Sequence, residues 1–334
     1  MKRRGFLLGK FLPPTEGHRF LAETALALTD ETVVLVCSTS SEPIAGALRA
    51  GWMRRMLPQA KIHHLHRDLP QAPEDHPDFW PIWRAAILET IIEPPTHVFA
   101  SETYVFRLAD ELGAQPVLVD PERIAVSVSG SGVLEAPAKH WRELPREVRP
   151  HFQKRLTLLG PESVGKTTLA GELAAAFDTR VMPEYGRTFD VAYKRGKEWR
   201  AQDLVRLAET HRAMRAGLAG LAGPLLIEDT DAVQTAVWSQ FLAQAVDPAL
   251  EAIECETLAD HYFLLEPDTP WVQDGVRYAG DPAARMFFFE EAQRRLDRLG
   301  AGYDIISGED WTVRRASALA AAERRFAGFL QSSR

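Results

Sequence analysis

Cysteine is scarce in this sequence, which holds only Cys37 and Cys255 among its 334 residues. The two lie far apart and have neither the spacing of a redox motif nor that of a metal-ligand set. A disulfide framework, a thiolate metal site and thiol redox chemistry are therefore excluded as organising features. Cys37 ends an apolar run, where a free cysteine behaves as a small buried hydrophobe. This pattern favours a reducing, cytoplasmic setting.

Long apolar runs are absent as well. The N-terminus carries basic residues followed by a short apolar stretch at residues 5–8, which is how a signal peptide begins. Lys10 follows soon after, so the stretch is too short for a signal-peptide core or for a membrane span. We therefore expect a buried first strand here and no association with membranes.

The sequence also lacks an excess of positive charge. It has 39 lysines and arginines against 46 acidic residues, a net charge of −7, so no extended nucleic-acid-binding face is expected. With 46% hydrophobic and 25% charged residues, the composition is that of an ordinary globular protein. A length of 334 residues exceeds the usual size of one hydrophobic core and favours two domains.

A glycine-rich motif lies near the middle of the chain. Residues 160–167 fit the pattern G-x-x-x-x-G-K-[ST], between an apolar stretch and a helical pattern. Strand, turn and helix in this order identify a phosphate-binding P-loop, and a chance match is the weaker explanation. Backbone N–H groups and the helix N-terminus would surround the phosphates. The predicted nucleotide-binding residues are Gly160, Pro161, Glu162, Ser163, Val164, Gly165, Lys166, Thr167 and Thr168.

Two side chains of this motif and one downstream acid have predicted roles in phosphate and metal binding. Lys166 would reach the β- and γ-phosphates of ATP, and Thr167 would place its hydroxyl on Mg²⁺. Residues 225–229 form an apolar run that ends in two acids, which is typical of a Walker B element. We predict that Asp229 holds Mg²⁺, with Asp231 as the alternate; capping of the next helix explains Asp231 equally well.

Strand-like and helix-like segments alternate throughout the chain, which predicts an α/β protein with two doubly wound parallel sheets. Three prolines and several charges at 137–151 indicate a linker between a first domain, 1–136, and a second domain, 152–334. The predicted strands are residues 5–8, 33–37, 61–65, 97–100 and 116–119 in the first domain, and 156–159, 180–182, 225–228, 261–265 and 303–306 in the second.

A second loop of phosphate-binding type follows the first predicted strand. The loop leads into a helix that begins near residue 17, so a triphosphate bound in the loop would lie on a helix N-terminus. Lys10 offers a charge, Thr15 a hydroxyl and His18 a hydrogen-bond donor. Taken alone, the loop is weak evidence, because a single histidine is more often a surface or capping residue.

The neighbouring residues strengthen this interpretation. Residues 9–18 resemble the loop G-x-F-x-P-x-[HT]-x-G-H of the nucleotidyltransferase superfamily, and residues 129–137 resemble its second loop, I-S-x-T-x-[IV]-R. The order of these loops, followed by a P-loop half, resembles the bifunctional NadR family, which joins nicotinamide mononucleotide adenylyltransferase to ribosylnicotinamide kinase. The resemblance implies a Rossmann-like nucleotidyltransferase domain whose nucleotide-binding residues are Gly9, Lys10, Phe11, Thr15, Gly17, His18, Ser129 and Ser131.

The chain departs from the family pattern in two ways. Leu134 stands where the second loop places an arginine that holds ATP phosphates, and Ser131 stands in place of a threonine. Leucine has neither a donor nor a charge, so a transition-state contact is predicted to be missing and the adenylyltransferase to be slow or inactive. No helix-turn-helix precedes Met1, so the repressor function of some relatives is not expected.

The second domain has further candidates for acceptor binding and catalysis. Glu184 follows the strand after the P-loop helix and is the predicted general base; binding of the acceptor ribose is the alternative. Arg187 would contact the acceptor or the phosphates, with a solvated surface position as the alternative. Tyr185 and Trp271 are candidates for stacking on a nicotinamide ring, although aromatic residues at such places are more often core.

Arginines near the end of the fourth strand of this domain resemble those of a kinase lid. Arg277 and Arg285 flank a loop at 278–282 and would neutralise charge that develops on the phosphates. An ordinary surface role explains either one taken separately. In the first domain, Trp83 lies three residues after Trp80 on a predicted helix and is a candidate for stacking on a pyridine, with burial as the simpler explanation.

Three functional hypotheses follow from these observations. The leading one is an enzyme of NAD synthesis and pyridine-nucleotide salvage, which phosphorylates nicotinamide riboside with ATP and joins the resulting nicotinamide mononucleotide to AMP. The second is a monofunctional kinase with a degenerate sensing domain, and the third is a non-catalytic regulator that responds to NAD or ATP. The predicted partners are these small molecules, without nucleic acid or membrane; the oligomeric state, including a homo-oligomer, is left open.

Overall fold

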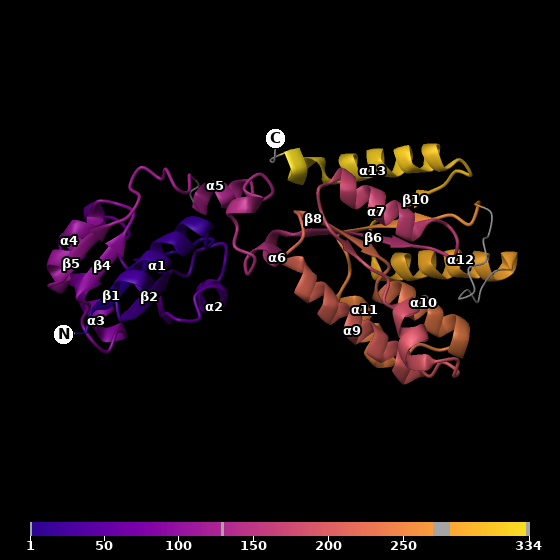
Figure 1. Ribbon diagram of the computed structural model, residues 1–334, viewed down its shortest axis with the longest axis horizontal. Helices are drawn as coiled ribbons and strands as arrows, with labels where there is room; N and C mark the ends of the chain where they lie inside the picture. Colours follow the sequence, from indigo (N-terminus) through magenta and orange to yellow (C-terminus); the bar gives the residue numbers. More distant parts are fainter. Residues whose placement is uncertain (1, 128–129, 270–280, 332–334) are drawn as a thin grey trace. The chain divides into compact units, whose positions relative to one another are not determined.

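The computed structural model describes residues 2–127, 130–269 and 281–331. Two compact units divide the chain, the first ending at Arg149 and the second beginning at Pro150. Each unit is a five-stranded parallel sheet covered by helices on both faces, which confirms the α/β fold predicted from the sequence (Figure 1). No helix within the described ranges is long and apolar enough to cross a membrane.

The first unit has the strand order β3-β2-β1-β4-β5. The chain therefore leaves β1 at the point where the order reverses, and the crevice at such a point is where ligands bind in open α/β sheets. The strands are β1 (Arg4–Gly9), β2 (Glu31–Ser38), β3 (Lys61–His66), β4 (His97–Ala100) and β5 (Gln115–Leu118); the main helices are α1 (Glu16–Leu28), α2 (Gly46–Met56), α3 (Phe79–Thr90), α4 (Tyr104–Leu112) and α5 (Gly130–Glu135).

The second unit has the strand order β10-β9-β6-β8-β7, so its reversal lies at β6 and the P-loop follows that strand. The strands are β6 (Lys154–Leu159), β7 (Val181–Met182), β8 (Leu225–Asp229), β9 (His261–Leu265) and β10 (Tyr303–Ile306); the helices of four or more residues are α6 (Arg149–Phe152), α7 (Lys166–Ala176), α8 (Gly186–Phe189), α9 (Ala201–Ala219), α10 (Ala232–Ala243), α11 (Pro248–Glu256), α12 (Pro282–Leu299) and α13 (Trp311–Gln331), with a π-helical turn, η3 (Asp190–Lys194), after α8.

The alternation of side chains along β9 shows how the second sheet is buried on both faces. Phe263 and Leu265 pack in the cluster that also holds residues of α7 and α13. Tyr262 and Leu264 pack in the opposite cluster, with residues of α10 and α12. A parallel strand covered on both sides is nearly all apolar, which is why the run at 261–265 was recognisable in the sequence.

Helix α11 and the segment Gly130–Glu135 are among the elements that differ from the sequence-based expectation. Helix α11 was not predicted, although Asp247 and Pro248 carry a start signal: the Asp247 carboxylate accepts from the N–H of Ala249 at 2.9 Å and proline occupies the first turn. The second phosphate loop of the first unit was expected as a loop, yet Gly130–Glu135 forms the short helix α5.

Helices α11 and α12 are joined by buried ionic contacts. Glu254 of α11 is fully buried and pairs with Arg295 of α12 at 3.2 Å. Arg295 is also buried and reaches Glu291 at 2.8 Å, while Arg298 approaches Glu254 at 3.1 Å. Ions in such a place are stabilising only as a set, because each would otherwise lose its hydration without compensation.

Replacing Glu254 by alanine is expected to lower the free energy of unfolding of the second unit by roughly 3 kcal/mol, since Arg295 keeps only part of its compensation. Urea unfolding, monitored by hydrogen exchange of the backbone amides in α11 and α12, measures the change in the free energy of unfolding. Glu256→Ala is the matched control, because its pair with Arg212 is exposed and such pairs contribute little. Equal losses for the two variants would contradict the argument.

Candidate functional sites

The P-loop joins β6 to α7 through a backbone that favours glycine at two positions. Gly160 and Gly165 have φ values of 137° and 87°, in the region that side chains rarely adopt. A Cβ at Gly160 would lie 2.7 Å from the carbonyl oxygen of Leu265, and one at Gly165 would lie 2.5 Å from the Trp311 ring. The loop therefore depends on both glycines for its shape.

Lys166 and Thr167 are held at the start of α7. The Lys166 ammonium donates to the carbonyls of Gly160 at 2.9 Å and Pro161 at 2.7 Å. Burial lowers its pKa, while the nearby carboxylates of Glu184 and Asp229 act in the opposite direction. Lys166 thus lies folded over the loop that it would share with a triphosphate.

Thr167 and Asp229 form a site suited to a divalent cation. The Thr167 hydroxyl donates to Asp229 Oδ2 at 2.6 Å, and Asp229 Oδ1 is buried without a hydrogen-bond partner in the described part of the chain. Hydroxyl and carboxylate oxygens beside a phosphate loop are the ligands that Mg²⁺ takes in nucleotide sites. The residues present therefore fit the ion.

The acids on either side of Asp229 have structural partners. Glu228 is fully buried, accepts from Thr157 at 2.8 Å and pairs with Arg155 at 3.4 Å. Asp231 caps α10 by accepting from the N–H of Val233 at 2.9 Å, and it also accepts from the Tyr262 hydroxyl at 2.8 Å. Burial raises the pKa of Asp231 to about 7, and the Glu228 charge adds to the shift.

Glu184 lies at the boundary of two cavities. One, of about 120 Å³, is lined by the P-loop; the other, of about 70 Å³, lies beside it. Burial raises the pKa of Glu184, and the Lys166 charge opposes that shift. The residues that line both cavities are Glu162, Glu184, Arg187, Gln234 and Trp238.

The smaller cavity has aromatic walls, some of which the sequence analysis missed. Tyr185 and Asp231 line it as well as Trp199 and Trp238. Trp199 stacks on the ring of Phe189, ten residues earlier, with ring centroids 5.8 Å apart, and no motif around residue 199 predicts this contact. Trp238 lies on α10 one turn after Gln234, whose side chain accepts from the N–H of Gly160 at 3.0 Å. The position of Trp238 about two turns after Asp231 on the same helix was the signal from which its place in this cavity could have been predicted.

Among the predicted lid and stacking residues, Trp271 and Arg277 lie outside the described residues. Arg285 is in the first turn of α12 and is 8% exposed. Its Nε and Nη2 atoms have no hydrogen-bond partner within the ranges that the structure covers. An ordinary surface role, the simpler explanation considered for Arg285 in the sequence, therefore does not apply. Arg285 lines neither of the two cavities described above.

A fully buried arginine, Arg314 of α13, supports the P-loop from below. It donates to the carbonyls of Val164 at 3.1 Å, Gly308 at 2.9 Å and Glu266 at 3.3 Å, and it pairs with Asp268. These contacts connect the phosphate loop to the ends of β9 and β10. The sequence did not reveal this role, because Arg314 is 150 residues from the loop that it contacts.

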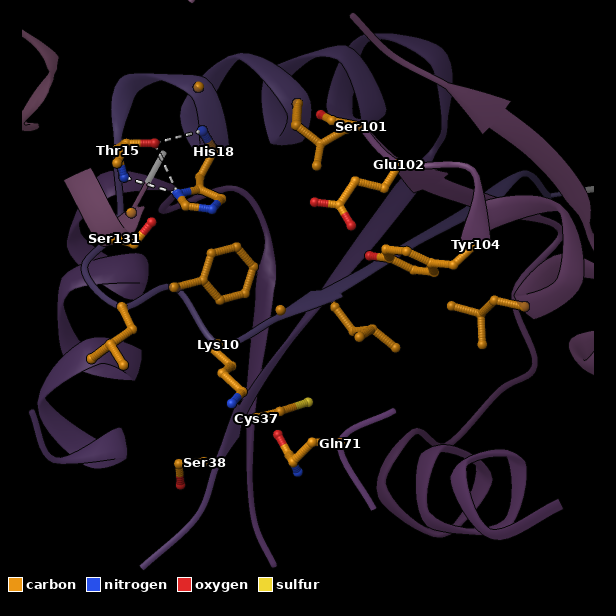
Figure 2. A pocket seen from close by; sticks show the side chains of 18 of the residues that line it. Lys10, Thr15, His18, Cys37, Ser38, Gln71, Ser101, Glu102, Tyr104 and Ser131 are labelled. Carbon is orange, nitrogen blue, oxygen red and sulfur yellow. Dashed lines mark hydrogen bonds between the residues drawn. The ribbon is translucent and has the colours of Figure 1, made fainter. Parts of the chain in front are cut away.

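The first unit has a larger cavity, of about 730 Å³, at the loop after β1 (Figure 2). Lys10, Thr15 and His18 line it, together with Ser131 and Leu134 of α5. Ser129 lies outside the described residues. The remaining predicted residues of the loop, Gly9, Phe11 and Gly17, are also in its wall.

His18 has a defined tautomer in this cavity. Thr15 caps α1, and its backbone N–H donates to His18 Nδ1 at 3.0 Å, as Figure 2 shows. The proton of the neutral ring is therefore on Nε2. Burial lowers the pKa of His18 to about 4, with a smaller contribution from the Arg123 charge, so the ring is a neutral donor at pH 7.

A second buried arginine holds this loop. Arg49 of α2 is fully buried and donates to the carbonyls of Lys10, Ile44 and Cys37. It also pairs with Glu42, whose other carboxylate oxygen lies 3.6 Å from Lys10 Nζ. The loop after β1 is thus fixed by contacts from β2 and α2.

Aromatic side chains gather in another part of the same cavity wall. Phe79, Trp80 and Trp83 of α3 contribute to it, with Tyr104 at the start of α4. The Trp83 indole donates to the carbonyl of Pro70 at 2.9 Å, which fixes the ring in place. Flat apolar surfaces beside a polar phosphate loop suit a nucleotide with an aromatic base.

Comparison with known proteins relates both units to one family. A protein-family model described as an AAA domain matches residues 155–314. The trifunctional NAD biosynthesis/regulator protein NadR of Salmonella typhimurium is 30% identical over an alignment of 306 residues that covers 86% of this chain and 74% of the relative. The protein of the same name from Escherichia coli is 29% identical over 332 residues, covering 94% of this chain and 81% of that one.

Two solved structures share the fold along nearly the whole chain. They are crystal structures of a NadR protein, one in complex with NR and one with NAD and AMP-PNP. Their TM-scores are 0.75 and 0.74 at 22% identity, and each comparison covers 97% of this chain and 96% of the other. At 22% identity, this similarity shows that the fold is shared and nothing further.

The desolvation of His18 in the cavity wall predicts its titration. In an NMR titration, the ring is expected to protonate near pH 4. Between about pH 6.5 and 4 the unfolded chain binds a proton that the folded one does not, so stability from this residue falls as the pH decreases through that window. A midpoint above pH 6 would contradict the described environment.

Arg314 is expected to control the P-loop. Arg314→Lys keeps the charge but cannot reach three carbonyls at once, so the KM for ATP should rise by about tenfold, roughly the loss of one charged hydrogen bond. Steady-state kinetics of ADP formation measure this. Arg315→Lys is the control, since that side chain is half-exposed. An unchanged KM in the Arg314 variant would contradict the argument.

Proposed function

The chain belongs to the NadR family, and from this premise we propose that its second unit transfers the γ-phosphate of ATP to the 5′-hydroxyl of nicotinamide riboside. The products would be ADP and nicotinamide mononucleotide. The relatives' name, which includes NAD biosynthesis, supports this reaction, and so does the solved NadR protein with NR. The observation that carries the proposal is the place of Glu184 between the P-loop cavity and the aromatic one.

Phosphoryl transfer depends on positioning and on neutralisation of charge. With the triphosphate on the P-loop and the nucleoside in the adjacent cavity, Glu184 accepts the proton of the 5′-hydroxyl as its oxygen bonds to the γ-phosphorus. The bond from that phosphorus to the β-phosphate oxygen breaks, and ADP leaves. Lys166 and the loop amides hold the phosphates.

Thr167 and Asp229 would hold Mg²⁺, which supplies charge neutralisation on the phosphates when bound. Asp229 Oδ1 is the buried oxygen left for this purpose. In the acceptor cavity, Tyr185 and Trp238 would bracket the nicotinamide ring, and Arg187 would contact phosphate or the acceptor. Asp231 would bind a ribose hydroxyl while it caps α10.

For the first unit we propose adenylyl transfer from ATP to nicotinamide mononucleotide. The phosphate of the mononucleotide attacks the α-phosphorus of ATP, forming NAD and releasing pyrophosphate. The protein contributes no nucleophile: His18 donates from Nε2, Lys10 adds charge, and the aromatic wall with Trp83 receives the pyridine. The wide cavity beside these groups supports a site for a dinucleotide.

The uncharged Leu134 in the cavity wall favours a second candidate for this unit. In that case the first unit binds a nucleotide as a sensor, and the chain is a kinase alone. Pyrophosphate release from ATP and nicotinamide mononucleotide distinguishes the two. We further propose a cytoplasmic protein whose partners are these small molecules, without nucleic acid or membrane.

The kinase proposal predicts that purified protein with Mg²⁺, ATP and nicotinamide riboside forms ADP. Glu184→Gln is expected to lower kcat by about 10²–10⁴-fold, because it removes the proton acceptor. Since burial raises the pKa of Glu184, kcat/KM should rise with pH as this carboxyl loses its proton.

Lys166→Ala should likewise abolish most of the activity, and Glu209→Gln, an exposed change on α9, should leave it intact. A Lys166→Ala protein as active as the parent would exclude the mechanism. Absence of ADP formation by the parent itself would favour a regulator that binds without turnover.

A further inference from the structure

The first-unit cavity contains a cation that the mechanism has not used. Three cationic side chains in the described part of the chain line the cavity: Lys10, Arg67 and Arg123. Arg67 pairs with Glu89 at 3.1 Å, and Lys10 lies 3.6 Å from Glu42. His18 is neutral at pH 7, so Arg123 is a second source of positive charge for a phosphate bound there, beside the Lys10 that the proposed mechanism uses.

The segment that carries Arg123 lies over the phosphate loop. Val126 approaches the first turn of α1 closely, since a Cβ added at Gly17 would lie 3.6 Å from its Cγ1. At Gly130, where α5 begins, an added Cβ would lie 2.9 Å from the carbonyl oxygen of Leu12. Val126 thus lies against the first turn of α1 and Gly130 against the loop after β1, and the Arg123 charge acts on the His18 ring.

The backbone at this point is held in an unfavourable conformation. Asp120 and Arg123 have φ values of 47° and 53°, in the left-handed region. The Asp120 carboxylate fixes the turn by accepting from the N–H groups of Ile124 at 2.9 Å and Ala125 at 3.1 Å. Ile124 is 80% exposed, so apolar burial does not account for the strain. Strained residues of this kind concentrate at ligand sites.

Arg123 has a partner that a phosphate can replace. Its Nη2 lies 3.2 Å from Glu102 Oε1, and both side chains are substantially exposed, 41% and 64%. Such a pair contributes little to stability. Figure 2 shows Glu102 and His18 directed into the cavity from different elements. A guanidinium binds phosphate with two parallel hydrogen bonds, which a leucine at position 134 cannot provide.

We propose that Arg123 contacts the phosphates of the nucleotide in the first unit and supplies the positive charge that Leu134 does not. This inference rests on the proposed nucleotide site of that unit. Glu102 is the counter-ion of Arg123 in the absence of the nucleotide, and the strained turn at Asp120 holds the guanidinium over the loop after β1.

The test measures pyrophosphate release from ATP and nicotinamide mononucleotide. Arg123→Gln should lower kcat/KM for ATP by about ten- to a hundredfold, the effect of losing a charged hydrogen bond. Arg123→Gly removes the same charge but relieves the left-handed backbone, because glycine adopts this conformation freely. An equal loss of activity in the two variants would show that the charge of Arg123 matters and the backbone strain does not. Arg55→Gln, an exposed change in the same unit, should have no effect.

Adding Leu134→Arg to the Arg123→Gln protein should raise kcat/KM for ATP at least tenfold above that of Arg123→Gln alone, because the second arginine restores charge in the same cavity. A merely structural role of Arg123 would not be rescued in this way. Full activity of both Arg123 variants, or loss without recovery in the double variant, would overturn the proposal.

Equilibrium binding of AMP-PNP to the full chain separates this inference from the proposed activity. The parent should bind at two sites, with Arg123→Gln weakening one of them and Lys166→Ala the other. If the parent releases no pyrophosphate, the proposed adenylyl transfer fails, yet selective loss of one AMP-PNP site in Arg123→Gln still supports the phosphate contact. Unchanged binding at both sites in that variant overturns it.

Discussion

A fully buried arginine lies beneath the P-loop and another beneath the loop after β1, and the shape of both candidate sites depends on them. Arg49 donates to carbonyls around the loop after β1, and Arg314 does so beneath the P-loop. A loop that directs its N–H groups toward an anion leaves carbonyls on its other side, and these need donors. Arginine suits the task because it offers five donors in a rigid fork and stays charged when buried.

This support has consequences for the ionisable groups around it. Because the loops are packed from below, Lys166 and Glu184 lie in partly dry surroundings, where burial lowers the pKa of the lysine and raises that of the carboxyl. Desolvation likewise lowers the pKa of His18 in the other unit, with a smaller contribution from the Arg123 charge. In such surroundings a charged or polar side chain interacts more strongly with a bound anion than it would in water.

Local patterns were enough to predict the sheets and the loops between them. The runs at β6, β8 and β9 were legible because strands covered on both faces are apolar throughout, and the P-loop was legible because its glycines and Lys166 are contiguous. Helix α11 was missed because its start signal, Asp247 with Pro248, is also typical of a turn. Arg314 was missed because the loop that it contacts is 150 residues away in the sequence, and Trp199 was missed because no motif marks its place in the cavity wall.

By itself, the sequence determined the α/β class, the two sheets and the positions of the P-loop and of the loop after β1, since these follow from the periodicity and spacing of neighbouring residues. The tertiary structure decided which side chains share a cavity. It brought Glu184 to the boundary between two cavities and placed Arg123 in the same cavity wall as Leu134. The physical reason is that strand order, unlike strand identity, depends on packing between residues far apart in the chain.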